Sequence, residues 1–389
     1  MAKSIRPILS PLLSISYMCG LRIIEFPAGN PRIWFSFLYI LLLWPAYCFT
    51  MINKLLSYIC NDSFEYRIYI FLNTLMTLLS MLLAIYHDKK FRNCLKKLAI
   101  VDDTLEKIGI MTNYQELSKK ITRIVLGWSV IALLLNCSDY IRWRDYYDVL
   151  TSICLTFMMN FCSHVNIIND LIFASILGYI GLKFDHINEH LHKLTTETKR
   201  ASGSLVLHQR GLLNVPTSKY ITWIIIHLHL ELHRISLEIN SIFEVEMTFK
   251  MVCYFGIIAE FLRQFFSTLF IRHYVAEKAI LITIIVIFWL AWYIVRLFII
   301  NYICEKVSAK ANATGDFINR ISHFTCNVEI RENILQFFFQ ITQAPLRFHG
   351  FQHGFQFGSK FFYRYFESIL ALIILLIQAD RFKHVLKNY

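Results

Sequence analysis

Charged residues are scarce in this sequence. Only 17% of its 389 residues are Asp, Glu, Lys or Arg, whereas about 25% is usual in a soluble domain. Hydrophobic residues make up 56%, and they include 33 Phe and 20 Tyr. A soluble protein of this composition would expose large apolar patches. We therefore interpret the chain as one helical bundle within a lipid bilayer, although its length alone would suggest two or three soluble domains.

Motifs of catalysis and cofactor binding are also missing. The sequence has no Walker A loop, no Gly-x-Ser-x-Gly elbow and no Rossmann fingerprint. Its ten Cys residues form no CxxC pair, which argues against a structural zinc site or a thioredoxin-type motif. The sequence therefore predicts a protein that is not an enzyme and has no cofactor.

Two His pairs, His186/His190 and His229/His233, have the spacing of four that puts both rings on one helix face. A zinc protease needs a Glu directly after the first His, and neither pair has one. We interpret these rings as packed or solvated, and we predict no metal site.

Long apolar segments dominate the rest of the chain. A helix needs about 20 apolar residues to cross the hydrocarbon core, and seven segments fit: Ile33–Ile52, Arg67–Tyr86, Ile121–Cys137, Val149–Ile180, Met247–Ile271, Ala279–Ile303 and Phe361–Ala379. The fourth is longer than a span requires, so we expect it to continue into the cytoplasm. The prediction is an all-α, polytopic membrane protein with seven transmembrane helices.

Basic residues collect in alternate connections. Segment 1–32 and the loops 88–120, 181–246 and 304–360 hold most of the Lys and Arg, whereas each of the other three loops has about two. The net charge of +12 therefore reflects membrane orientation and not nucleic-acid binding. The positive-inside rule puts the N-terminus and the long loops in the cytoplasm.

This orientation divides the chain into regions. We predict a cytoplasmic N-terminal segment 1–32, six transmembrane helices with their loops over 33–303, a cytoplasmic helical segment 304–360, a seventh transmembrane helix 361–380 and an extracellular tail 381–389. We do not interpret the first thirty residues as a cleaved signal peptide, because Pro7 and Pro11 interrupt their apolar stretch.

Two glycosylation sequons test the orientation independently. Asn61-Asp62-Ser63 lies in the first predicted outer loop, and Asn312-Ala313-Thr314 lies in a predicted cytoplasmic segment. Only Asn61 is therefore expected to carry a glycan.

Polar and aromatic residues inside the predicted spans are candidates for a ligand cavity. Glu260 and Arg263 lie three residues apart on one helix face. Ionisable groups in a span usually face a cavity or each other, so they form either a structural ion pair or part of a ligand site. The other candidates combine aromatic and polar side chains as small-molecule pockets do: Trp128, Asn136, Asn160, Trp289 and Trp292.

Three passages resemble the insect gustatory receptors of the seven-transmembrane insect chemoreceptor superfamily. They are the helix from Leu228 to Phe243 with its Asn-Ser-Ile-Phe ending, the charged helix from Glu305 to Gly315, and the seventh helix. In that helix the family shows Thr-Tyr, five hydrophobic residues and Gln-Phe. This chain has the five hydrophobics and Gln378, but Ala371, Leu372 and Ala379 replace Thr, Tyr and Phe.

The resemblance implies a taste receptor of the plasma membrane of sensory neurons. It would be a ligand-gated cation channel, a homotetramer or a heterotetramer with related receptors, and its partners would be membrane lipids and a small-molecule tastant. Gln378 and Ala379 would line the outer constriction of a central pore, with Leu375 or Leu376 as part of an apolar gate. The ligand cavity would open outward among spans two to six.

Three alternatives remain open. An odorant receptor of the same superfamily would usually need a co-receptor. A G-protein-coupled receptor would have its N-terminus outside, which the loop charges oppose. A secondary transporter would often show internal repeats and interrupted helices, but the sequence has no visible repeat and a single Pro, Pro45, within a predicted span.

Overall fold

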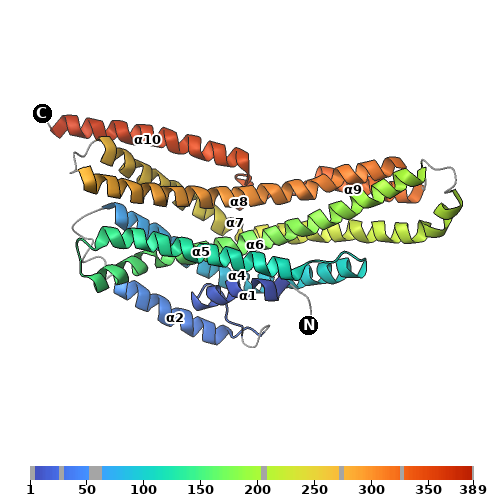
Figure 1. The fold of residues 1–389 in the computed structure, drawn as a ribbon, viewed down its shortest axis with the longest axis horizontal. Coiled ribbons are helices and arrows are strands. Elements are labelled where there is room, and N and C mark those ends of the chain that lie inside the picture. Colours follow the sequence, from blue (N-terminus) through green and yellow to red (C-terminus); the bar gives the residue numbers. More distant parts are fainter. Residues whose placement is uncertain are drawn as a thin grey trace.

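Nearly all of the described chain is helical. The computed structural model describes residues 5–25, 30–51, 64–202, 208–270, 276–324 and 328–387. Its helices are α1 (Ile5–Met18), α2 (Ile33–Thr50), α4 (Phe64–Lys107), α5 (Tyr114–Trp143), α6 (Val149–Ser202), α7 (His208–Phe270), α8 (Ala276–Phe324), α9 (Val328–Gln343), the short 3-10 helix η3 (Phe351–His353) and α10 (Ser359–Lys387). The long helices run roughly side by side along the molecule, with α2 and α10 on opposite sides of the bundle (Figure 1).

Four helices are much longer than a bilayer is thick. At 1.5 Å per residue, the 54 residues of α6 extend for roughly 80 Å, and α4, α7 and α8 are also longer than 40 residues. The hydrocarbon core is only about 30 Å thick. The segments that join the predicted spans are thus largely helical continuations of the spans.

Five helical segments in the described part of the chain are long and apolar enough to cross a membrane: Ile33–Thr50, Arg67–Tyr86, Tyr114–Trp143, Val149–Lys193 and Ile280–Arg320. The other two predicted spans fall in α7 and α10, where ionisable residues such as Lys250 and Glu367 interrupt the apolar sequence. Ile271, the last residue of the fifth predicted span, lies outside the described residues.

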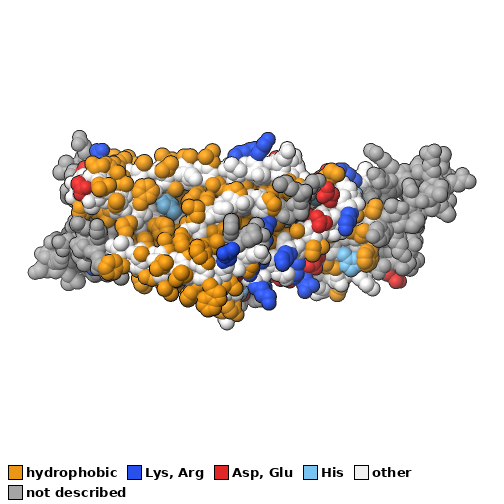
Figure 2. Space-filling view, turned by 90° about the horizontal axis from the view of Figure 1, so that it is seen from below, with side chains coloured by type: hydrophobic (Ala, Val, Ile, Leu, Met, Phe, Trp, Pro, Cys, Tyr) orange, Lys and Arg blue, Asp and Glu red, His pale blue; other side chains and the backbone are white. Residues whose placement is uncertain are grey.

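The surface is divided into an apolar and a charged part. Hydrophobic side chains cover one continuous region, and Lys, Arg, Asp and Glu gather beyond it (Figure 2). On α2, Trp34 is 87% exposed, and Phe35, Phe37 and Leu38 are exposed with it. Such a surface is stable against lipid tails and not against water.

Helix α6 lies at the centre of the fold. It packs against α1, α4, α5, α7 and α8, and its membrane segment is mostly buried. Ile172, Ile176 and Ile180 are fully buried one turn apart, which is the spacing of a continuous helix face.

The N-terminal segment, for which the sequence analysis predicts no helix, contains the helix α1. Pro11 lies inside it, and Leu9 and Leu12 are buried against the bundle. The helix ends in a Schellman motif, in which Leu21 N–H donates to Ser16 O at 2.9 Å and Gly20 N–H donates to Tyr17 O at 3.1 Å. Gly20 has a φ of +71°, the left-handed conformation that this motif requires.

Candidate functional site

A pocket lies between the membrane helices. Residues of α4, α5, α6, α7 and α8 line a space of about 590 Å³ that is partly open to the outside. Most of the lining is apolar, with Ile68, Met159, Ile257, Phe261 and Ile285 among its residues. We refer to this space as the inter-helix pocket.

A carboxylate organises the polar side of the inter-helix pocket. Asp139 of α5 accepts hydrogen bonds from Asn160 Nδ2 at 2.7 Å and from Trp289 Nε1 at 3.0 Å. Asn160 also donates to Asn136 Oδ1 at 3.1 Å, and Tyr69 OH donates to Asn160 Oδ1 at 3.4 Å. These bonds join α4, α5, α6 and α8 and hold the polar groups in fixed directions.

Two aromatic rings form a wall beside Asp139. The rings of Tyr69 and Trp289 meet edge to face with their centres 5.8 Å apart, and Phe261 lies 6.1 Å from Tyr69. A mostly apolar space with a few fixed polar groups is the usual form of a small-molecule site.

A second set of polar groups comes from α7. Arg263 Nη2 donates to Glu260 Oε1 at 2.7 Å, and Arg263 Nε lies within 3.2 Å of both carboxylate oxygens. Both side chains are about one-quarter exposed, and Glu260 lines the pocket with Gln264 and Arg142. The pair therefore satisfies its own charges and still borders the pocket.

Only some of the ligand-site residues predicted from the sequence line the pocket. Asn160, Glu260 and Trp289 line the inter-helix pocket. Asn136 and Arg263 do not line the pocket, but they form hydrogen bonds with the lining residues Asn160 and Glu260.

Two of the predicted aromatic residues are not in the lining. Trp128 packs against His164 with ring centres 6.5 Å apart, and Trp292 packs against the hydrophobic core. Both indole N–H groups are buried without a hydrogen-bond partner in the described part of the chain.

Sequence reasoning missed Asp139, Tyr69 and Arg142. Asp139 lies two residues beyond the predicted end of the third span at Cys137, so it was assigned to a loop, whereas α5 continues to Trp143. A carboxylate one turn from Asn136 was the available signal, since both lie on one helix face.

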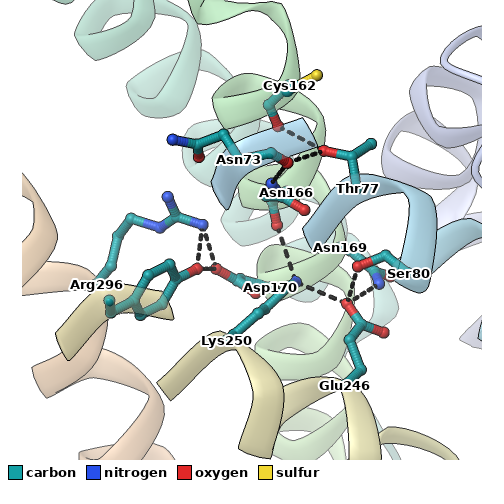
Figure 3. Close-up of polar contacts among 11 residues, drawn as sticks. Asn73, Thr77, Ser80, Cys162, Asn166, Asn169, Asp170, Glu246, Lys250 and Arg296 are labelled. Carbon is teal, nitrogen blue, oxygen red and sulfur yellow. Dashed lines mark hydrogen bonds and ion pairs between the residues drawn. The ribbon is translucent and has the colours of Figure 1, made fainter. Parts of the chain in front are cut away.

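Four ionisable residues of α6, α7 and α8 form the buried charge cluster of Asp170, Glu246, Lys250 and Arg296 (Figure 3). Lys250 Nζ bridges Asp170 Oδ1 and Glu246 Oε1, each at 2.7 Å, and Arg296 Nη2 lies 2.6 Å from Asp170 Oδ2. Two positive and two negative charges balance. Buried charges of this kind are stable only when paired.

Neutral side chains complete the cluster. Ser80 Oγ donates to Glu246 Oε1 at 2.8 Å, Asn169 also donates to Glu246, and Tyr254 OH donates to Asp170 Oδ2 at 3.1 Å. The cluster therefore links α4, α6, α7 and α8, which are four of the five helices that line the inter-helix pocket.

Aromatic packing connects the inter-helix pocket with the buried charge cluster. Tyr293 packs against Trp289 on the pocket side and against Tyr254 on the cluster side, with ring centres 6.4 Å and 5.5 Å apart. Tyr293 OH also donates to Asn73 Oδ1 at 3.4 Å.

The cluster in turn lies next to the attachment of α10. Tyr365 OH of α10 donates to the carbonyl of Met251 at 2.8 Å, one residue from Lys250. The start of α10 is held by α8, because Ser359 N–H donates to Glu305 Oε2 and Ser359 Oγ donates to Glu305 Oε1, both at 2.9 Å.

Helix α10 has one packed and one open face. Tyr365, Ile369 and Ile373 are buried against the bundle, whereas Leu370 and Ile374 are exposed. Of the residues predicted to form the pore and gate, Leu375 and Gln378 are exposed. The side chains of Leu376 and Ala379 lie outside the described part of the structure.

The structure describes only one of the two glycosylation sequons. Asn61 lies outside the described residues. Asn312 is part of α8, and its side chain is engaged with the backbone of Leu346: Leu346 N–H donates to Asn312 Oδ1 at 2.9 Å, and Asn312 Nδ2 donates to Leu346 O at 3.3 Å.

The His229/His233 pair contacts backbone carbonyl groups. His229 Nε2 lies 3.1 Å from Ala311 O, and His233 Nε2 lies 3.1 Å from Ala344 O. Burial lowers the pKa of His229 to about 4, so its ring is neutral at pH 7 with the proton on Nε2. Among the residues that the structure describes, no three His, Cys, Asp or Glu side chains form a group suited to a metal ion.

One comparison with known proteins identifies a family, and a second identifies a similar fold. Residues 9–380 match the model of the 7tm chemosensory receptor family. The structure of the insect olfactory receptor OR5 from Machilis hrabei has a TM-score of 0.68 at 11% identity, with 96% of this chain and 98% of that chain covered. OR5 in complex with eugenol gives the same TM-score at 10% identity and the same coverage. No curated protein sequence matches.

The chain therefore belongs to the 7tm chemosensory receptor family. It is a multi-pass membrane receptor with the all-α fold of insect OR5. This family consists of receptors and not of enzymes.

Proposed function

We propose that this receptor is a gustatory receptor subunit: a ligand-gated, non-selective cation channel that detects small-molecule tastants in sensory neurons. The observation that carries the proposal is the inter-helix pocket, in which Asp139, Asn160 and Trp289 present fixed polar groups within an apolar space. OR5, which has the same fold, is known in complex with eugenol, and a space between membrane helices suits such a compound.

The proposed channel layout has seven spans with the N-terminus in the cytoplasm and the C-terminus outside. Alternating basic loops favour this orientation. Each of the seven apolar segments of the sequence overlaps one of the helices α2, α4, α5, α6, α7, α8 and α10. Charges within α7 are compatible with a span because Lys250 is paired inside the bundle. We place the receptor in the plasma membrane.

Helix α10 is proposed to line a central pore in a tetramer, formed with identical or related subunits. Its exposed residues Leu370, Ile374 and Gln378 recur every four positions and form a stripe along the helix. In an assembly this stripe would face the axis, with Gln378 at the outer constriction and Leu375 or Leu376 in the apolar gate.

The proposed coupling runs from pocket to pore through buried contacts. A ligand that contacts Trp289 would displace Tyr293. This displacement would pass to the buried charge cluster and then to the hydrogen bond between Tyr365 and Met251 that holds α10. A ligand shifts the closed–open equilibrium only by its difference in affinity for the two states. The pocket therefore has to change shape when α10 moves.

An odorant receptor is the second candidate, because solved structures with a similar fold include those of an olfactory receptor. The two candidates differ in their need for a partner. Ligand currents from cells that express this chain alone favour the gustatory proposal, and currents that appear only with a co-receptor favour the odorant one.

The test of the channel proposal is recording from excised patches without nucleotides, with a panel of sugars, bitter compounds and eugenol. We expect ligand-evoked cation currents, and Gln378→Ala should alter conductance or ion selectivity. The matched control is Gln340→Ala, because Gln340 is exposed on α9, away from the proposed pore. Currents that disappear without GTP would contradict the channel, and an unchanged Gln378→Ala variant would contradict the pore assignment.

A further inference from the structure

A second, smaller pocket lies between α1, the segment that follows it and the end of the membrane span in α4. It has a volume of about 260 Å³, part of which is open to solvent. Its charged lining residues are Arg6, Arg22, Arg92, Glu25 and Asp88. We refer to it as the arginine pocket.

The charges of the arginine pocket do not balance. Arg6 pairs with Glu25. Arg92 Nη2 lies 2.6 Å from Asp88 Oδ2, and Arg92 Nε lies 4.0 Å from Glu25. Three guanidinium groups thus share two carboxylates, and Arg22 makes no ion pair with a carboxylate in the described part of the chain. The pocket therefore carries one excess positive charge.

Arg22 is buried in spite of its charge. Its residue is only 4% exposed, and its guanidinium carbon lies 3.7 Å from the centre of the Phe91 ring and 5.8 Å from that of Phe243. Its Nε–H is buried without a hydrogen-bond partner among the described residues. Burial lowers the pKa of Arg22 to about 10, although the negative charges of Glu246 and Asp88 act in the opposite direction. The group therefore remains charged at pH 7, with carboxylates near it but none in an ion pair with it among the described residues.

The backbone around Arg22 is well defined. The Schellman motif at Gly20 ends α1 two residues earlier, and Ile24 N–H donates to Ser36 Oγ of α2 at 2.8 Å. A Cβ atom at position 20 would lie 3.3 Å from Ile40 Cγ1. Arg22 is thus held by α1 and α2 and is not a mobile surface side chain.

The depth of the arginine pocket matches a membrane interface. Asp88, Phe91 and Arg92 follow within two turns of Tyr86, where the apolar span of α4 ends. Tyr86 and Trp34, the second residue of α2, are both strongly exposed. Exposed Tyr and Trp are typical of the head-group level of a bilayer.

We infer that the arginine pocket binds a phosphate group, and that at this depth the phosphate belongs to the head group of an anionic lipid. Arg22 would give charge-assisted hydrogen bonds to the phosphate oxygens through its unpaired N–H groups, and the anion would balance the excess charge. This site is separate from the inter-helix pocket, and its existence does not depend on the proposed channel function.

The test measures lipid binding to the purified full-length protein in neutral detergent. The probes are dioctanoyl phosphatidic acid, dioctanoyl phosphatidylcholine and inorganic phosphate. The variants are Arg22→Gln, which removes the excess charge, and Glu25→Gln, which increases it. Arg320→Gln is the matched control, because Arg320 is exposed and far along α8 from the pocket.

We expect phosphatidic acid to bind more tightly than phosphatidylcholine, Arg22→Gln to weaken its binding about tenfold, and Glu25→Gln to tighten it. Arg320→Gln should bind like the wild type. If inorganic phosphate binds as tightly as phosphatidic acid, the pocket binds phosphate but its ligand is a free anion. If inorganic phosphate binds more weakly than phosphatidic acid, the ligand is the lipid head group.

Two results would overturn the inference. One is equal binding of phosphatidic acid and phosphatidylcholine, and the other is a set of Arg22 and Glu25 variants that bind like Arg320→Gln. If Arg22→Gln fails to fold, Glu25→Gln decides, because misfolding cannot produce tighter binding.

Discussion

At the scale of single residues, Lys250 shows how charge is accommodated within this fold. Its side chain is fully buried, and its ammonium bridges Asp170 and Glu246. Without Lys250, one of these carboxylates would be buried without a counter-charge, and removal of one partner from a buried ion pair costs about 3–5 kcal/mol.

Lys250→Met is therefore expected to lower the thermal stability of the purified protein strongly. The double variant Lys250→Met/Glu246→Gln should recover much of the loss, because Asp170 and Arg296 then balance. Lys306→Met, which removes an exposed charge from α8, is the control. Thermal unfolding followed by fluorescence checks this order of stabilities, and a double variant less stable than the single one would contradict it.

The same residues show what sequence reasoning can reach. Asp170, Lys250 and Arg296 all lie inside predicted spans, so their cost in lipid was a visible signal. Their pairing with Asp170 was not visible, since Lys250 and Arg296 are 80 and 126 residues from it. Glu246 lies one turn from Lys250 on the same helix, so that pair was within reach of the sequence. Glu260 and Arg263 could be paired from sequence because three residues fix their geometry within one helix.

At the scale of elements, α10 is held to the bundle by few polar contacts. Tyr365 OH bonds the carbonyl of Met251, and such a bond contributes about 1 kcal/mol. The opposite face of the helix has no partner within the described monomer.

Tyr365→Phe is expected to weaken the docking of α10 without changing its apolar packing. Backbone amides of α10 should then exchange hydrogen faster, by up to about fivefold for 1 kcal/mol. Tyr363→Phe is a matched control, because Tyr363 is 73% exposed. Hydrogen exchange followed by mass spectrometry measures the effect, and equal exchange in the two variants would contradict the role of Tyr365.

The sequence predicts a helix correctly where an apolar run is long enough to span a membrane. Five of the seven predicted spans coincide with helical segments long and apolar enough to cross a membrane, because a membrane span must satisfy its backbone internally. Helix α1 was missed, because Pro7, Pro11 and several Ser residues are unfavourable for helices. Burial of Leu9 and Leu12 against the bundle outweighs that preference.

At the scale of the whole molecule, the proposed function depends on the orientation of the bundle. The helical extensions of α4, α6, α7 and α8 carry most of the basic residues of the loops, which favours their location in the cytoplasm. The engagement of Asn312 with Leu346 inside this region agrees with an Asn that carries no glycan.

The glycan gel shift of the full-length protein in insect cells tests this orientation most directly. Our account predicts a glycan that is lost with Asn61→Gln and retained with Asn312→Gln, which fixes the first loop outside and the N-terminus inside. A glycan lost only with Asn312→Gln would invert the protein, and the proposed channel layout would be wrong.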